Sequence, residues 1–151
     1  MRWTKGQFEV DTDLERLDLD FVHKQLKQTY WGKDRSKKIV QAGFRESKVV
    51  FGLYDRKADG KIIGFTRAVS DTTTFAWLAD VFIDSAYRGK GLGKFLMRCV
   101  LKHPDCGKVR QFFLGTRDAH GLYEQFGWQR PPMPELYMVR ATNTWWSKKR
   151  S

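Results

Sequence analysis

The stretch Tyr87-Arg88-Gly89-Lys90-Gly91-Leu92-Gly93-Lys94 lies between an apolar run that ends with Val81-Phe82-Ile83 and an amphipathic segment from Phe95 to His103. This order predicts a strand, a glycine-rich loop and a helix that begins at the loop. Glycines let backbone amides approach a ligand closely, and the first helical turn leaves amide protons without partners at the positive end of the helix dipole. The stretch therefore predicts a phosphate-binding loop.

The spacing of the glycines excludes two common phosphate loops. A mononucleotide P-loop has four residues between its glycines and then Lys followed by Ser or Thr, whereas here Lys94 is followed by Phe95. The dinucleotide fingerprint needs a third glycine where this chain has Lys94. A different phosphate ligand is therefore expected.

Strand and helix patterns alternate along the rest of the chain. Strands are predicted at 8–11, 48–55, 62–69, 74–84, 109–115 and 136–142, with a hairpin turn at Asp59-Gly60 between the second and third. Helices are predicted from the Asp18 cap to about Gly32, after the Ser36 cap, from Leu92 to Lys102 and at 118–126. Because a strand, a helix and a strand follow closely from 74 to 115, those two strands are expected to be parallel.

Composition and charge limit the functional classes. The chain has 151 residues, 41% of them apolar and 15% aromatic, which predicts one packed domain. No apolar run is long enough for a membrane span or a signal peptide, so a cytoplasmic protein without a membrane partner is expected. The two cysteines, Cys99 and Cys106, are expected to be reduced, and no metal site is predicted.

The formal net charge of +11 raises the question of a nucleic-acid partner. The basic residues are scattered, however, and they accompany no zinc-finger, RRM or clear helix-turn-helix pattern. Nucleic acid is therefore not the expected partner.

Two motifs in this chain resemble those of the GNAT superfamily of N-acetyltransferases. The acetyl-CoA loop of that family has the pattern Arg/Gln-x-x-Gly-x-Gly/Ala, which Arg88, Gly91 and Gly93 satisfy. The segment from Ala119 to Trp128 resembles the second family signature, a helix that carries a tyrosine, here Tyr123, and ends in Gly and an aromatic residue. The resemblance spans about residues 8–140. It implies a single α/β (α+β) domain with a mixed, mostly antiparallel central sheet and about four flanking helices.

The resemblance also implies roles for individual residues. The pyrophosphate of CoA would bind the loop, the backbone at Phe82 and Ile83 would pair with pantetheine, and Tyr123 would protonate the leaving thiolate. Many family members have an Asn that binds the pantetheine arm where this chain has Thr116. The implied acetyl-CoA site consists of Phe82, Ile83, Arg88, Gly89, Lys90, Gly91, Leu92, Gly93, Lys94 and Thr116.

The residue that removes a proton from the acceptor amine is identified only by position. Asp80, on the strand just before the acetyl site, is the first candidate for this general base, and Asp118 and His120 are the alternatives. Trp31, Phe44, Trp77 and Trp128 would suit an aromatic acceptor wall, although core packing is the favoured explanation for them.

The expected function is direct acetyl transfer from acetyl-CoA to a primary amine, without a covalent enzyme intermediate. A CoA-binding sensor or interaction module without turnover is the alternative. The N-acetyltransferase domain is expected at 1–142 and a polar, basic tail at 143–151, in which Trp145-Trp146 could dock on the body or on a second subunit of a possible homodimer.

Overall fold

A computed structural model of the protein describes residues 1–142 and contains one six-stranded sheet in that range. The strands lie in the order of the chain, and every neighbouring pair is antiparallel except the last, β5 with β6, which is parallel. The strands are β1 (Arg2–Lys5), β2 (Phe8–Asp11), β3 (Val49–Asp55), β4 (Lys61–Ser70), β5 (Phe75–Ile83) and β6 (Gln111–Leu114).

Five α-helices connect and cover these strands within residues 1–142. They are α1 (Leu19–Leu26), α2 (Lys37–Glu46), α3 (Leu92–Lys102), α4 (Pro104–Gly107) and α5 (His120–Glu124). The carboxylate of Asp18 accepts from the amides of Asp20 and Phe21 and so caps α1, while the Ser36 hydroxyl caps α2. Both caps were predicted from the sequence and are confirmed.

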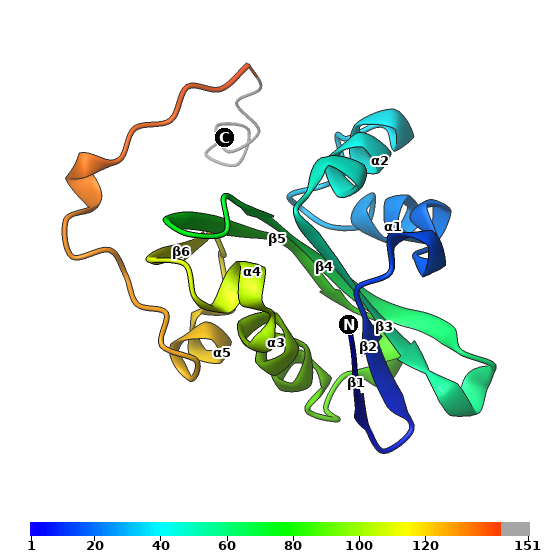
Figure 1. Cartoon of the computed structure of the whole chain (residues 1–151). Coiled ribbons are helices and arrows are strands. Elements are labelled where there is room, and N and C mark those ends of the chain that lie inside the picture. The colour runs from blue at the N-terminus through cyan, green and yellow to red at the C-terminus, as the bar shows by residue number, and fades with distance from the viewer. Residues whose placement is uncertain (143–151) are drawn as a thin grey trace.

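The helices lie in two layers on opposite faces of the sheet (Figure 1). Helices α1 and α2 pack on one face around Phe44 and Phe65, and α3 packs on the other face around Phe51 and Leu96. The helices bury apolar stripes because Val22 and Leu26 recur at helical spacing on α1, as Leu92, Leu96 and Val100 do on α3. The predicted mixed, mostly antiparallel single domain is confirmed.

The sheet opens at one end, between β5 and β6. The two strands pair from Phe75 with Gln111 to Leu78 with Leu114, after which β5 continues to Ile83 while β6 ends. The edge of β5 from residue 79 to residue 83 therefore faces no strand on the β6 side within the described chain. We call this opening the wedge.

A bulge in β5 lies at the start of the wedge. Asp80 adopts a left-handed φ of 57°, and the pairing of β4 with β5 shifts register between Phe65 and Arg67. Thr66 lies inside this shift, and its hydroxyl donates to the carbonyl of Ala79 at 2.8 Å. A bulge of this kind turns side chains and backbone groups out of their regular alternation, and here it does so beside the opening.

One sequence prediction about the end of a helix was wrong, and one strand was not predicted. Helix α1 ends at Leu26 rather than near Gly32, since Thr29 and Gly32 form a turn in which the Thr29 hydroxyl bonds both the Leu26 carbonyl and the Gly32 amide. Strand β1 was not predicted, and it forms because Gly6, with φ of 57°, turns the chain into a hairpin with β2.

The strand predicted at 136–142 is absent. Prolines at 131, 132 and 134 remove amide donors and fix φ, a 3₁₀ turn covers Pro134–Leu136, and the chain then runs away from the sheet (Figure 1). Met138 is 98% exposed, so the run of apolar residues from Leu136 to Val139 pairs with no neighbouring strand. The predicted tail at 143–151, with Trp145-Trp146, lies outside the described residues.

Candidate functional site

The glycine-rich loop forms the start of α3, as predicted. Gly89 and Gly91 have φ of 80° and 73°, and Gly91 is the N-cap residue of α3 without a side-chain cap. The first intrahelical bond runs from the Phe95 amide to the Gly91 carbonyl. Within residues 1–142, the backbone amides of residues 92–94, which come before Phe95, donate to no protein acceptor. They are therefore available to an anion at the positive end of an eleven-residue helix.

Side chains from distant strands hold this loop in place. The Tyr87 hydroxyl donates to the buried carboxylate of Asp55 at 2.9 Å, and the Gln7 side-chain amide donates to the same carboxylate at 3.0 Å. Lys5, at the end of β1, brings its Nζ to 3.6 Å from where a Cβ on Gly91 would lie. The β1–β2 hairpin, which was not predicted from the sequence, thus adds a positive charge beside the loop. Its sequence signal is the glycine after Lys5, which permits a tight turn.

A cavity of about 620 Å³ occupies the wedge. Three segments build it: the loop between α1 and α2, the bulged part of β5, and the residues that follow β6. The charged and polar groups that line it are Tyr30, Trp31, Arg35, Arg67, Asp80, Thr116, Arg117, Asp118 and Tyr123. We call it the wedge cavity. Of the residues predicted to act in catalysis, Asp80, Asp118 and Tyr123 are thereby brought together.

Asp80 is the most extensively bonded carboxylate of the wedge cavity. Its side chain is only 2% exposed and accepts from Arg35 at 2.5 and 3.0 Å, from Arg67 Nε at 2.8 Å and from Trp31 Nε1 at 3.1 Å. Burial alone would raise the pKa of Asp80, but the hydrogen bonds and charges of Arg35 and Arg67 outweigh it and hold that pKa below its ordinary value.

Tyr123 lies on α5 with its side chain buried between two cavities. It lines the wedge cavity and a second cavity of about 460 Å³ beneath Phe112 and Trp128. Its ring meets Trp128 edge to face at 5.8 Å. Helix α5 ends at Glu124, before the predicted stop, and Gly127, with φ of 97°, lies in the turn that follows. Burial raises the pKa of Tyr123 to about 12, so its hydroxyl stays protonated across the neutral range.

Thr116 and the two alternative bases lie around the start of α5. The Thr116 hydroxyl accepts from the amide of Ala119 at 3.1 Å and keeps its own proton for another acceptor. Asp118 was expected to cap α5 but does not, because Ala119 is the N-cap and Asp118 is 71% exposed, 3.9 Å from Arg117. His120 lines the second cavity rather than the wedge cavity.

The remaining predicted residues lie along the path from the wedge to the loop. Phe82 stacks on Phe65 at 5.1 Å, and Phe82 and Ile83 pair in register with Phe65 and Gly64 of β4. The other edge of β5 at these two residues faces no strand within the described chain. Arg88 Nε donates to the Ile83 carbonyl at 3.4 Å. The cavity, the open strand edge and the glycine loop thus form one continuous run along β5.

Both cysteines are buried and unbonded to one another. Burial raises the pKa of Cys99 to about 11 and that of Cys106 to about 12, so neither thiol ionises readily.

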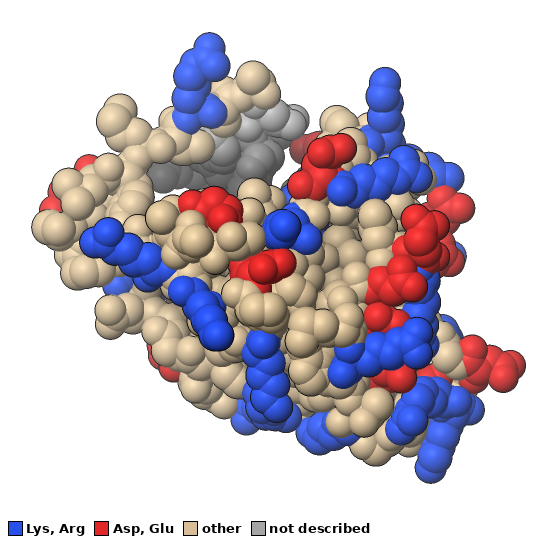
Figure 2. All heavy atoms as spheres, in the orientation of Figure 1, with Lys and Arg blue, Asp and Glu red and all other residues tan. Residues whose placement is uncertain are grey.

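Basic side chains are spread over the face seen in Figure 2 and interspersed with acidic ones rather than gathered in one patch. No helix within residues 1–142 is both long and apolar enough to span a bilayer.

Sequence reasoning missed Arg35 and Arg67 as partners of Asp80, and it named the third partner, Trp31, only as a candidate for an aromatic wall. Arg35 lies in the loop after α1, Trp31 lies in the same loop, and Arg67 lies on β4. No local motif marks them, because their roles depend on the bulge that brings Asp80 to their side of the sheet.

Comparison with known proteins gives a consistent picture. Residues 15–128 match the model of the acetyltransferase (GNAT) family. A crystal structure of a protein from Xanthomonas campestris pv. campestris, described as a GNAT-family acetyltransferase, is 40% identical, with a TM-score of 0.83, over 89% of this chain and 93% of that one. An acetyltransferase of Gibberella zeae is 26% identical over 80% of this chain and 78% of its own length. An N-acetyltransferase of Porphyra purpurea is 28% identical over 85% of this chain and 82% of its own length.

Proposed function

Because this chain belongs to the acetyltransferase (GNAT) family, whose members use acetyl-CoA, we propose that it transfers the acetyl group to the primary amine of an acceptor by direct attack. The observation that carries the proposal is the continuity of three features along β5: the wedge cavity, an open strand edge and a helix start with unbonded amides. Acetyl-CoA has three parts in the same order: an acetyl thioester, a pantetheine arm and a pyrophosphate.

The loop supports phosphate binding through backbone and charge together. The amides at 92–94 would donate to the pyrophosphate, while Arg88, Lys90 and Lys94 supply positive charge around it. Lys5 extends this positive surface from the neighbouring hairpin. Residues 79–83 of β5 would offer their free edge to the amide groups of pantetheine, and the backbone near Ile83 would face the thioester carbonyl.

Tyr123 is proposed to donate to the leaving thiolate. A thiol has a pKa of about 8.5, so a phenol whose pKa is about 12 does not transfer its proton completely to that thiolate. It can nevertheless donate a hydrogen bond while the carbon–sulfur bond breaks, and such donors stabilise developing negative charge. The Thr116 hydroxyl, which lines the same cavity as Tyr123, is proposed to bond the pantetheine arm.

Deprotonation of the acceptor requires a base. An amine with a pKa of about 10.4 is almost entirely protonated at pH 7. Asp80 stays the first proposed base because of its position, yet its lowered pKa and its four hydrogen bonds favour a second role, that of holding Arg35 and Arg67 at the cavity. Asp118 and His120 stay the alternatives.

Direct attack is favoured over a covalent enzyme intermediate. The nucleophile of a covalent route would be a thiol, and Cys99 and Cys106 are both buried with raised pKa values outside the wedge cavity. In the proposed reaction the amine nitrogen bonds the acetyl carbon, the carbon–sulfur bond breaks, and the proton lost by the amine balances the one gained by the thiolate.

Release of free CoA thiol from acetyl-CoA in the presence of a panel of primary amines tests this function. Amine-dependent thiol release is expected. Tight binding of acetyl-CoA without release for any amine would instead support the alternative of a CoA-binding sensor module.

A further inference from the structure

The charges of the wedge cavity are unusual for a site that receives an amine. Three arginines, Arg35, Arg67 and Arg117, line it against two aspartates. Asp80 is 2% exposed and accepts from three side chains, and the two arginines among them outweigh its single negative charge. Asp118 is 71% exposed at the rim, next to Arg117.

The arginines keep donors that no described residue uses. Arg35 binds Asp80 through its two terminal nitrogens, and Arg67 uses Nε on Asp80 and Nη1 on Ser47, at 3.2 Å. A guanidinium has five N–H donors, so each retains some for a ligand. Their side chains are 23% and 18% exposed, so part of each guanidinium reaches the cavity.

Arg117 adds a third guanidinium at the mouth. Its carbon lies 4.0 Å from the centre of the Tyr30 ring, and its backbone amide donates to the Tyr30 hydroxyl at 3.0 Å. Stacking and this bond keep Arg117 over the cavity although its side chain is 58% exposed. Its partner Asp118 lies at 3.9 Å, near the limit of an ion pair, and leaves most of its donors available.

A positive cavity acts on an amine in two ways. It lowers the pKa of the ammonium group, because a like charge disfavours the protonated form, and so increases the neutral fraction that can attack. It also repels an acceptor that carries further positive charge. An anionic group elsewhere on the acceptor would be attracted, and guanidinium groups match carboxylate and phosphate oxygens in geometry.

Building on the proposed function, we propose that the acceptor is an amine that also bears a carboxylate or phosphate group, which binds Arg117 and the free donors of Arg35 and Arg67. Polyamines and lysine-rich peptides are thereby disfavoured. The aromatic rings of Trp31 and Tyr30 form the apolar part of the same wall and suit the carbon skeleton between the amine and the anion.

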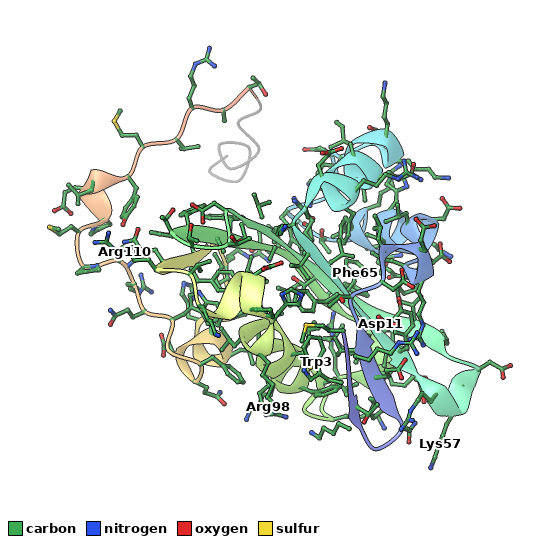
Figure 3. All side chains as sticks on the ribbon, viewed as in Figure 1. Trp3, Asp11, Lys57, Phe65, Arg98 and Arg110 are labelled. Atoms are coloured by element: carbon green, nitrogen blue, oxygen red, sulfur yellow. The ribbon has the colours of Figure 1, made fainter. Side chains whose placement is uncertain are left out.

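Matched pairs of amines test this proposal. Phosphoethanolamine with ethanolamine tests the phosphate, phenylalanine with 2-phenylethylamine tests the carboxylate, and spermidine tests added positive charge. At low ionic strength kcat/KM is expected to be about tenfold or more higher for the anionic member of at least one pair, and lowest for spermidine. The ratio within that pair is expected to fall toward one in Arg117→Gln and to persist in Arg98→Gln, a matched variant on the outer face of α3, where Figure 3 shows Arg98 pointing into solvent.

A binding measurement separates this inference from the proposed function. Inorganic phosphate is titrated calorimetrically into protein saturated with CoA, so that the glycine loop is already filled. Millimolar binding that weakens at least fivefold in Arg117→Gln but not in Arg98→Gln supports the anion site, even if no amine of the panel reacts. Absence of phosphate binding, or a preference for neutral or cationic amines that Arg117→Gln leaves unchanged, overturns it while acetyl transfer stands.

Discussion

Arg35 and Asp80 form a two-point ion pair in the wall of the wedge cavity, with Nη1 3.0 Å from Oδ2 and Nη2 2.5 Å from Oδ1. Arg35 lies in the loop between α1 and α2, and Asp80 lies at the bulge of β5, so the pair ties a helical connection to the centre of the sheet. Arg67 binds the same carboxylate from β4. The wall of the wedge cavity is therefore fixed by one buried aspartate and the charges around it.

Replacement of Asp80 with Asn is expected to destabilise the protein. Removal of one partner of a buried ion pair leaves the others without a counter-charge, which costs about 3 kcal/mol in the free energy of unfolding. Urea denaturation followed by tryptophan fluorescence measures this change. The matched variant Asp59→Asn, on the exposed hairpin turn, controls for loss of a carboxylate, and equal stability of the two variants would contradict the assignment.

The stability contributed by Asp80 is expected to depend on pH in one direction. Its pKa is lower in the folded protein than the unfolded value of about 3.9, so its contribution is complete above that value and is lost as pH falls toward the folded pKa. The difference in unfolding free energy between the wild type and Asp80→Asn should be constant from pH 5 to 7 and shrink below about pH 4. A difference that grows on acidification would reverse the sign required by these contacts.

Lys5 is expected to contribute to CoA binding although it lies far from the loop in sequence. Lys5→Gln should weaken CoA binding about twofold to fivefold at low salt, because an exposed charge interacts weakly and is screened. Calorimetry at two salt concentrations measures the effect, which should nearly vanish at 0.5 M salt. Lys57→Gln is the matched control, since Figure 3 shows Lys57 pointing into solvent at the far end of the β3–β4 hairpin.

Tyr123→Phe is expected to slow turnover without loss of CoA affinity. Loss of a donor to a leaving group typically costs 10- to 100-fold or more in kcat. Because the pKa of Tyr123 is about 12, the wild-type rate should show no decline attributable to this group up to about pH 10. An unchanged kcat in the Phe variant would assign Tyr123 to packing against Trp128 instead.

Local chemistry explains what the sequence predicted well. The caps at Asp18 and Ser36, the hairpin at Asp59-Gly60, and the loop that opens α3 all depend on residues within a few positions of each other. Asp59 and Gly60 have φ of 55° and 67°, values that their sequence favours on its own. Glycine spacing and helical periodicity were therefore sufficient to place the glycine loop at the start of α3.

Non-local contacts account for what the sequence did not predict. The left-handed φ of Asp80 has no sequence signal, because Asp is only mildly tolerant of that region, and the arginines that bind it come from other segments. The segment at 136–142 was predicted as a strand but does not form one. Its run of apolar residues has the composition of a strand, but a strand also requires a partner, and the prolines before it direct the chain elsewhere.

The central claim is that backbone amides at the start of α3 bind the pyrophosphate of CoA, and calorimetric titration of acetyl-CoA into Gly91→Ala tests it most directly. Alanine at φ of 73° is strained and should displace those amides, whereas Gly121→Ala lies at an open position on α5 and serves as the control. The account predicts binding by the wild type and Gly121→Ala, and affinity at least tenfold weaker for Gly91→Ala. Equal affinity for all three proteins, or no binding by the wild type at millimolar acetyl-CoA, would contradict it.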